Sequence, residues 1–113
     1  MTLVSTTRVG HWRRNRCDVY IGRGSPWGNP YVFPGMARRS RYPVTEVEDP
    51  LAAYEAHIRA DAAAMAALPT LRGKVLGCFC VDVDAPLPTK REDERCHGHV
   101  LVRLLGEVAE RSP

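Results

Sequence analysis

The chain of 113 residues is 44% hydrophobic and 26% charged, with a formal net charge of +3, and these are ordinary values for one globular domain. No run approaches the roughly 20 apolar residues of a membrane-spanning helix, and the first residues lack the pattern of a secretory signal. We therefore expect a single domain over residues 1–113, located in the cytoplasm and without a membrane partner, whose four cysteines stay reduced.

Positive charge is concentrated in the first part of the chain. Residues 1–42 contain eight arginines and one acidic residue, Asp18. The planar guanidinium group of arginine suits two-point contacts with phosphate or carboxylate. One interpretation is a solvated basic face without a specific role. The other, which we favour, is binding of an anionic partner such as a nucleotide or a nucleic acid.

The first half of the chain predicts short strands separated by loops. Residues 6–9 are a short candidate strand, and residues 18–21 are a clearer one because β-branched and aromatic residues precede Gly22. Residues 31–33 are a brief extended piece. Residues 34–48 carry three further arginines, and we expect them to form a mobile surface connection.

A helix is predicted to begin at Asp49 and Pro50. Aspartate is a preferred N-cap residue, and proline is favoured at the first helical position. Apolar residues follow at steps of three and four, and many alanines favour helix and close approach to a sheet. This helix must end before Pro69.

A strand and a second helix complete the chain. Residues 74–80 are almost continuously apolar, as is typical of a central strand covered on both faces. The charged connection over 82–95 is expected to be a lid or a mobile loop. A helix with one apolar face then begins at His97 or Gly98. Alternating strands and helices predict an α/β fold, with a small, mostly parallel sheet packed by two main helices.

The loop from Gly22 to Pro30 is the better candidate for a binding element. Its glycines let backbone amides approach a ligand, and it follows a strand, where open α/β sheets bind ligands. Arg23 adds a charged donor, Trp27 a flat face for stacking and Asn29 an amide. The alternative is a structural loop in which Trp27 caps the core. The predicted ligand-binding residues are Arg8, Gly22, Arg23, Gly24, Ser25, Trp27, Gly28 and Asn29.

Cysteine and histidine residues form the second candidate site. Cys78 and Cys80 are two residues apart on a predicted strand, so their side chains share a face. Cys96 precedes the last helix, whose N-terminus favours the thiolate form of a cysteine, and His97 follows directly. His99 lies about one turn further on.

Three interpretations of this cluster stay open. In the first, Cys78, Cys80, Cys96 and His97, or His99 in its place, bind a structural or catalytic zinc ion. In the second, Cys80 or Cys96 is a reactive thiol and His97 is its base, which makes Cys80, Cys96 and His97 the catalytic candidates. In the third, Cys78 and Cys80 are core residues and His97 only bonds the start of the helix.

Three motifs occur in order along the chain: DVYIGRGSPWGNP at 18–30, GKVLGCFC at 73–80, and CHG at 96–98 before an apolar helix. Together they resemble domain-of-unknown-function family 4326, a family of small bacterial and phage proteins. The resemblance implies that the loop and the cysteine cluster form one functional unit, and it brings no particular activity with it. This chain differs from the usual pattern at His99, which is why we prefer His97.

The two candidate sites both follow predicted strands, and a parallel sheet brings such positions to one edge. We therefore expect an enzyme directed at a nucleotide or a nucleic acid, in which the loop binds and the cluster supplies chemistry or holds a metal. Hydrolysis, glycosidic or phosphoryl transfer, and base modification all stay open. One alternative is a non-catalytic, zinc-stabilised nucleic-acid-binding module. Another is a phage or host protein-interaction domain that uses Tyr31, Phe33 and neighbouring arginines.

Overall fold

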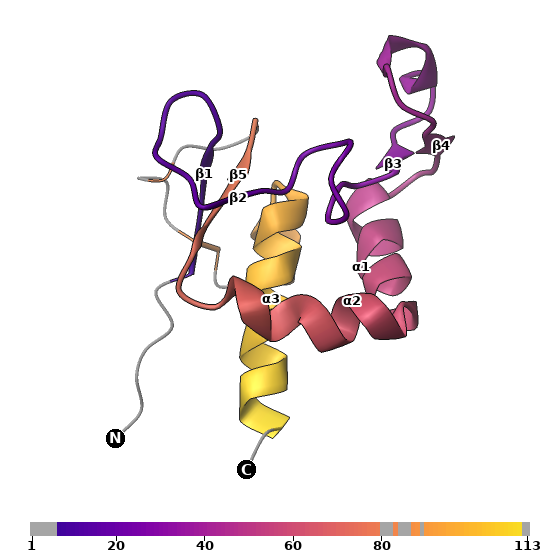
Figure 1. The fold of residues 1–113 in the computed structure, drawn as a ribbon. Coiled ribbons are helices and arrows are strands. Elements are labelled where there is room, and N and C mark those ends of the chain that lie inside the picture. Colours follow the sequence, from indigo (N-terminus) through magenta and orange to yellow (C-terminus); the bar gives the residue numbers. More distant parts are fainter. Residues whose placement is uncertain (1–6, 80–82, 84–86, 89, 112–113) are drawn as a thin grey trace.

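The computed structural model of the chain (Figure 1) describes residues 7–79, 83, 87–88 and 90–111. Within them the chain forms five strands, three α-helices and three 3-10 turns. In chain order these are β1 (Arg8–His11), β2 (Val19–Tyr20), β3 (Tyr31–Val32), η1 (Ala37–Arg39), β4 (Thr45–Glu46), α1 (Pro50–Ala60), α2 (Ala62–Ala67), η2 (Leu68–Leu71), β5 (Val75–Cys78), η3 (Arg91–Asp93) and α3 (His97–Arg111). No helix among these is long and apolar enough to cross a membrane.

The larger sheet has three parallel strands in the order β1-β5-β2. The register pairs His11 with Cys78 and Tyr20 with Gly77, so the three strands end at one edge of the sheet. We call it the carboxyl edge. Strand β5 lies between its two neighbours, and Leu76, Gly77 and Cys78 are buried. The predicted α/β fold with a small, mostly parallel sheet is therefore confirmed, and so is the central position of this strand.

A second, two-stranded parallel sheet joins β3 to β4. It contains part of the segment 34–48, which the sequence predicted to be a simple surface connection. The backbone N–H of Val47 donates to the carbonyl of Val32 at 2.8 Å, and a carboxylate oxygen of Glu46 accepts the N–H of Ala37 at 3.0 Å. These bonds give the segment regular structure that its polar sequence did not indicate.

The first predicted helix begins as expected, with the Asp49 carboxylate accepting the N–H of Ala52 at 3.1 Å. The expectation of one helix up to Pro69 is wrong, because the chain leaves helical conformation at Asp61. The Asp61 carboxylate accepts the N–H of Ala64 at 3.1 Å and so caps a separate helix, α2. An aspartate side chain competes in this way with the backbone hydrogen bonds of a continuous helix.

Helix α3 lies between the three-stranded sheet and α1 (Figure 1). Its apolar face was predicted from the spacing of its leucines and valines. Val100, Leu101, Leu104 and Leu105 are buried, and Val108 at its far end is half-buried. Leu76 of β5, Ile21 beyond β2 and Tyr54 of α1 meet this face in one hydrophobic core. This packing fixes the start of α3, with Cys96 and His97, beside the carboxyl edge of the sheet.

Candidate functional site

A cavity of about 560 Å³ opens at the carboxyl edge of the three-stranded sheet. This volume lies within the roughly 300–1,000 Å³ that is typical of sites for small ligands. Segments far apart in the sequence line it. They are the Gly22–Pro30 loop, the end of β5, residues 94–97 at the start of α3, and the first turn of α1. The last segment is 31–46, which contains β3, η1 and β4 and which we call the β3–β4 lobe. The loop and the cysteine–histidine cluster therefore meet in one place, as the parallel sheet predicted.

The Gly22–Pro30 loop is held in shape by hydrogen bonds to its own backbone. The Ser25 hydroxyl donates to the carbonyl of Gly22 at 2.6 Å, and the buried Tyr54 hydroxyl donates to the carbonyl of Trp27 at 2.7 Å. A Cβ atom on Gly28 would lie 2.8 Å from the carbonyl oxygen of Gly22, closer than real side chains come. The loop is thus built tightly, and only glycine fits at Gly28.

Three predicted ligand-binding residues of this loop line the cavity: Gly22, Arg23 and Asn29. Arg23 is exposed and uses its Nε to donate to the carbonyl of Asn29 at 3.1 Å. The Asn29 side chain is occupied, since its Oδ1 accepts the N–H of Tyr31 at 2.9 Å and its Nδ2 donates to the carbonyl of Pro50 at 3.4 Å. Asn29 therefore ties the loop to α1, and Arg23 is the side chain that can still meet a ligand.

The other predicted ligand-binding residues do not line this cavity, namely Arg8, Gly24, Ser25, Trp27 and Gly28. The Trp27 side chain is half-buried against the hydrophobic core, which matches the structural alternative that the sequence left open. Arg8 lies on β1, where its guanidinium donates to the carbonyl of Val83 at 2.7 Å. These residues shape the loop and the sheet around the site.

Cys78 and Cys96 lie at the floor of the cavity. Their sulfur atoms are 3.1 Å apart, and each residue is only 1% exposed. Cys96 precedes α3, and its sulfur accepts the backbone N–H of Gly98 at 3.4 Å, as an N-cap side chain does. A negative charge on this sulfur is therefore stabilised by the start of the helix.

The ring of His97 has a defined hydrogen-bonding role. Its Nε2 contacts the carbonyl oxygen of Ile21, which can only accept, so Nε2 carries the proton. Burial lowers the pKa of His97, and the ring is therefore neutral at pH 7. In the neutral ring Nδ1 has a lone pair, and this atom lies 3.9 Å from the Cys96 sulfur. Nδ1 is placed to take up a proton from that thiol.

Not every member of the predicted cluster is placed in this way. Cys80 lies outside the described residues. His99 accepts the N–H of Arg95 with its Nδ1 at 3.0 Å and does not line the cavity, and its burial lowers its pKa. Among the described residues, no group of three or more His, Cys, Asp and Glu side chains is arranged to hold a metal ion. The zinc site stays a prediction.

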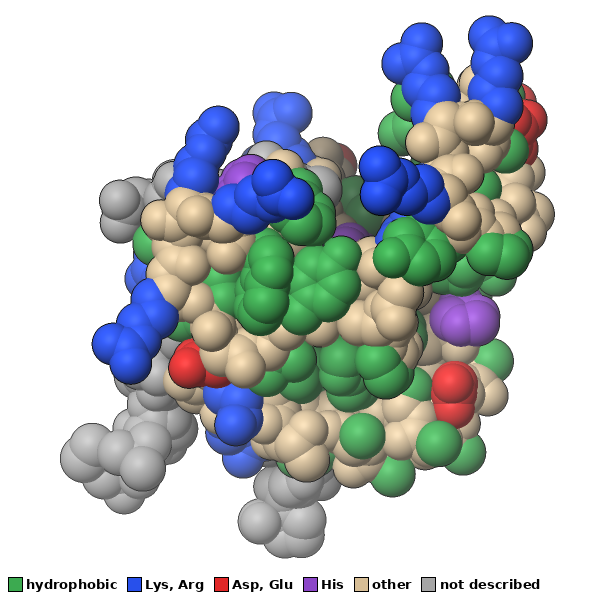
Figure 2. Space-filling view, turned by 45° about the horizontal axis from the view of Figure 1, so that its top comes forward, with side chains coloured by type: hydrophobic (Ala, Val, Ile, Leu, Met, Phe, Trp, Pro, Cys, Tyr) green, Lys and Arg blue, Asp and Glu red, His purple; other side chains and the backbone are tan. Residues whose placement is uncertain are grey.

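Further charged and apolar side chains at the cavity were not predicted. Besides Arg23, the exposed arginines Arg39 and Arg95 line it, and so does Glu94, whose carboxylate is paired with Arg103. Phe79 and Met36 supply apolar walls. Figure 2 shows a patch of hydrophobic side chains with basic side chains above it and to its left. Arg39 could have been found from the sequence because it lies among other arginines. Arg95 could not, because it stands at the end of a connection that is charged throughout.

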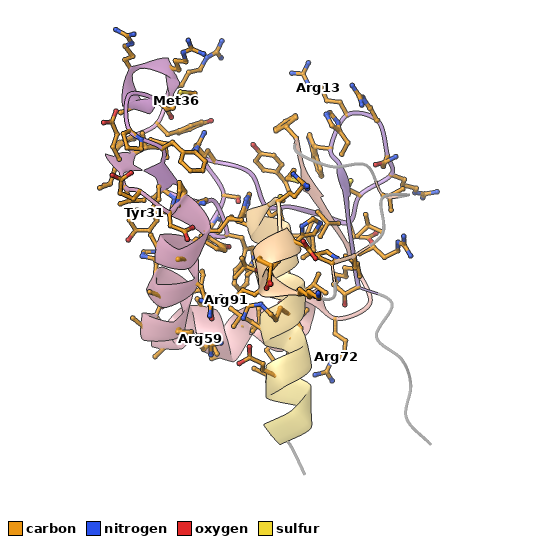
Figure 3. All side chains as sticks on the ribbon, turned by 180° about the vertical axis from the view of Figure 1, so that it is seen from behind. Arg13, Tyr31, Met36, Arg59, Arg72 and Arg91 are labelled. Atoms are coloured by element: carbon orange, nitrogen blue, oxygen red, sulfur yellow. The ribbon has the colours of Figure 1, made fainter. Side chains whose placement is uncertain are left out.

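A buried carboxylate that the sequence did not single out positions the segment before α3. Glu55 of α1 contacts Arg59 at 2.9 Å, Arg91 at 2.7 Å and Arg103 at 2.6 Å, and Arg103 also contacts Glu94 at 2.7 Å. The hydrogen bonds from Arg103 are the largest cause that lowers the pKa of Glu55 to about 2. Figure 3 shows Arg59 and Arg91 between α1 and α3. We call this set the Glu55 network.

The Glu55 network ties η3 and Glu94, the residues just before Arg95 and Cys96, to both helices. Part of the 82–95 connection, which the sequence predicted to be a lid or a mobile loop, is therefore bound to the helices at its end. The sequence contained one sign of this network, the four-residue spacing of Glu55 and Arg59. That spacing did not single the two residues out, because it gives an ordinary ion pair in many helices.

The fold and the cavity define a small α/β domain with a ligand-sized site at the carboxyl edge of a parallel sheet. The chain belongs to the family described as Domain of unknown function (DUF4326), whose model matches residues 4–107. The predicted resemblance is thereby confirmed. No curated protein and no solved structure matches the chain. What the site does must therefore be argued from its own chemistry.

Proposed function

We propose that this protein is an enzyme that acts on a nucleotide, either free or as one unit of a nucleic acid, bound in the cavity at the carboxyl edge. One observation carries the proposal. The Gly22–Pro30 loop and the pair formed by Cys96 and His97 line the same cavity, together with three arginines. A binding element for an anion and a candidate nucleophile with its base thus share one space.

The walls of the cavity match the two halves of a nucleotide. The guanidinium groups of Arg23, Arg39 and Arg95 suit a phosphate group, because each offers several N–H donors in a plane. Tyr31 and Phe79 offer flat apolar surface for a base or a sugar. A ligand that is both anionic and flat fits this combination better than a simple anion does.

Cys96 and His97 supply the chemistry in this proposal. Nδ1 of His97 accepts the thiol proton, and the N–H of Gly98 stabilises the thiolate that remains. The sulfur attacks an electrophilic centre of the nucleotide, the bond from that centre to its leaving group breaks, and His97 returns the proton to the leaving group. Water, losing a proton to His97, then forms a bond to that centre, the bond from the centre to sulfur breaks, and the proton from His97 restores the Cys96 thiol. Whether the centre belongs to the sugar, the base or a phosphate defines the reaction, and a panel of substrates decides it.

Binding tests the first half of the proposal. We expect the wild-type protein to bind at least one of AMP, GMP, CMP and UMP in titration calorimetry. Arg23→Ala is expected to weaken that binding about tenfold or more, since a hydrogen bond to a charged group contributes ~1.5–3 kcal/mol. The matched control is Arg72→Ala, an exposed arginine that does not line the cavity. If neither these nucleotides nor a short single strand binds in a way that Arg23→Ala weakens, the proposal is wrong.

Alkylation tests the second half. Iodoacetamide is expected to modify Cys96 in the free protein and to do so more slowly when a bound nucleotide fills the cavity. Cys96→Ala is expected to keep nucleotide binding and to lose turnover, because it removes the nucleophile and leaves the arginines in place. Turnover that persists in Cys96→Ala contradicts the role of the thiol.

The two close cysteines also support a second candidate, the zinc-stabilised nucleic-acid-binding module. A zinc ion bound at about 2.3 Å from two thiolates in tetrahedral geometry separates them by about 3.8 Å. The 3.1 Å between the sulfur atoms of Cys78 and Cys96 needs only a small opening to reach this. Elemental analysis of the purified protein tests the idea. One zinc per chain, with unfolding on chelation, favours the module, and protein without zinc that stays folded excludes it.

A further inference from the structure

We infer that the surface beside the cavity binds single-stranded nucleic acid, so that the nucleotide in the cavity is one unit of a strand. The inference deepens the proposed function, and it rests on it only for the unit inside the cavity. It comes from three exposed or half-buried aromatic rings to which the sequence analysis gave no role, and from the arginines on both sides of them.

Three aromatic rings lie together at the carboxyl edge and form what we call the aromatic cluster: Trp12, Tyr20 and Phe79. The ring centroids of Trp12 and Tyr20 are 5.1 Å apart, and those of Tyr20 and Phe79 are 6.0 Å apart. The register of the sheet causes this, because each ring stands at or just past the end of one of the three neighbouring strands. The parallel sheet therefore brings together three rings that are far apart in the sequence.

The aromatic cluster is open to solvent. Trp12 is 41% exposed and Phe79 is 49% exposed, although both are large and apolar. Gly77 makes room beneath the cluster, since a Cβ atom there would lie 2.6 Å from the Trp12 ring. The rings are thus packed against the sheet on one side and open on the other. Exposed aromatic faces of this kind are stacking platforms for bases.

Arginines stand on both sides of this platform and of the cavity. Arg13, Arg14 and Arg16 follow Trp12 in the chain and are exposed. On the β3–β4 lobe a second group stands beside Phe33 and Tyr42, which are 61% and 50% exposed. That group consists of Arg38, Arg39 and Arg41. No acidic residue in the described part of the chain forms an ion pair with any of these six arginines.

The two arginine groups mark out a path. Figure 3 shows Arg13 and Met36 at the same end of the molecule, on the two sides of it, and Met36 lines the cavity. A nucleic-acid strand that runs from one arginine group to the other passes the aromatic cluster and the mouth of the cavity. Its phosphates meet guanidinium groups at both ends, and its bases meet rings between them.

A single strand fits this surface better than a duplex does. In a duplex the faces of the bases are stacked on one another, so a duplex can use the arginines but not the exposed rings of Trp12 and Phe79. An unpaired strand can use both, and it can turn one nucleotide into the cavity that Phe79 helps to line. An acidic protein segment would use the arginines and leave the rings without a flat partner.

The experiment compares fluorescein-labelled 12-nucleotide single strands, oligo-dT and oligo-U, with a 12-base-pair duplex, by fluorescence anisotropy at several salt concentrations. We expect at least one single strand to bind more tightly than the duplex. The logarithm of its binding constant should fall with the logarithm of salt by about 0.7 for each phosphate contact. A poly-glutamate peptide of the same charge serves as the protein-like competitor.

Two variants and a matched control locate the surface. Trp12→Ala is expected to weaken strand binding by about fivefold to 100-fold, as the loss of one stacked base does. The double variant Arg13→Ala/Arg14→Ala is expected to weaken it and to reduce the salt dependence. Both arginines are exposed, so this variant stays informative if Trp12→Ala does not fold. Arg72→Ala, at the opposite end of the molecule in Figure 3, is expected to bind like the wild type.

Several results would overturn the inference. They are equal affinity for strand and duplex, equal competition by poly-glutamate, or wild-type strand binding in both variants. Binding of mononucleotides without binding of strands also refutes it, while leaving the proposed function intact. Strand binding that Trp12→Ala weakens and Arg23→Ala leaves unchanged refutes the proposed nucleotide cavity and supports the surface. The two ideas therefore fail separately.

Discussion

Arginine occupies two opposite environments in this molecule. Between α1 and α3, Arg59 and Arg103 surround a Glu55 side chain that is only 7% exposed. At the carboxyl edge and on the β3–β4 lobe, arginines such as Arg13 and Arg38 are exposed, and the described acidic residues form no ion pair with them. The guanidinium groups of the first set are paired with Glu55 and connect the helices, whereas those of the second set are accessible to a ligand.

The comparison teaches that the net charge of the chain does not distinguish two kinds of arginine, those paired with a buried carboxylate and those exposed without an ion pair. A buried carboxylate surrounded by guanidinium groups contributes to stability mainly because removing one partner leaves the others without compensation. An exposed arginine contributes little to stability, and its charge stays available for long-range attraction of an anion. The predictions below test whether the two regions differ as sharply as this.

The largest effect is expected for Glu55→Gln. The change removes the carboxylate that three arginines share, and we expect the free energy of unfolding to fall by about 2–4 kcal/mol, measured with urea. The control is Glu92→Gln in η3, an exposed residue with no ion pair among the described residues, which should change little. Equal stabilities of the two variants would contradict the role of the network.

Glu55 also makes the stability of the folded protein depend on pH in the acidic range. The pKa of Glu55 is lowered to about 2 in the folded protein, below the value of about 4.3 in an unfolded chain. A lowered carboxyl pKa contributes stability that is present above about pH 4.3 and is lost as the pH falls towards 2. Glu55→Gln should therefore lose less stability than the wild type between these two values.

A smaller pair of effects with opposite signs is expected at two glycines. Gly28→Ala places a Cβ atom 2.8 Å from the backbone oxygen of Gly22 and should destabilise the protein by about 1–3 kcal/mol. In α3, a Cβ atom on Gly106 meets nothing within 4 Å, so Gly106→Ala should stabilise the helix by about 0.5–1 kcal/mol. Thermal melting followed by circular dichroism measures both.

Gly28→Ala also has a functional side. The loop around Gly28 carries Arg23 into the cavity, so the variant should weaken nucleotide binding in those molecules that remain folded. Gly106→Ala lies far from the cavity along α3 and should bind like the wild type. If both variants bind equally, the shape of the loop does not matter for the site.

Histidine gives a third effect, in a different pH range. Burial lowers the pKa of both His97 and His99, so both are neutral in the folded protein and take up protons more readily when it unfolds. This contribution is present above about pH 6.5, the ordinary value, and is lost as the pH falls below it. We expect stability to drop between pH 7 and 5, in urea unfolding measured at both pH values. Replacing His97 or His99 by Gln should reduce that drop.

The smallest effect is expected for Arg13→Ala, whose unfolding free energy should stay within about 0.5 kcal/mol of the wild type. Arg103→Ala is its counterpart in the Glu55 network, and this variant should lose several times as much. A large loss of stability in Arg13→Ala would show that the arginines at the carboxyl edge are also structural, and the comparison between the two regions would fail.

Much of the fold could be predicted because its signals are local. Asp49 and Pro50 start α1 through contacts within one helical turn, and the apolar run at 74–80 indicates a central strand. The sequence also placed the Gly22–Pro30 loop and the cysteine–histidine cluster together. That prediction needed only the rule that parallel strands end at the same edge.

The remaining features escaped prediction for identifiable reasons. The break at Asp61 depends on a side chain that fits equally well on the surface of a helix and at its cap. Strand β4 is only two residues long and exists through its pairing with β3. For Trp27 the sequence left stacking on a ligand and capping of the core open, and the half-buried side chain packs against the core and does not line the cavity.

The sequence by itself determined where most of the short strands lie, where α1 and α3 begin, and that two motifs with binding and thiol chemistry exist. These follow from capping, periodicity and glycine placement, which act over a few residues. Only the tertiary structure decided which arginines are paired and which are open, and which rings meet. Glu55 and Arg103 are 48 residues apart, and Tyr20 reaches Phe79 only through the register of β2 on β5. Such contacts depend on how distant segments pack, and a pattern along the chain does not contain that information.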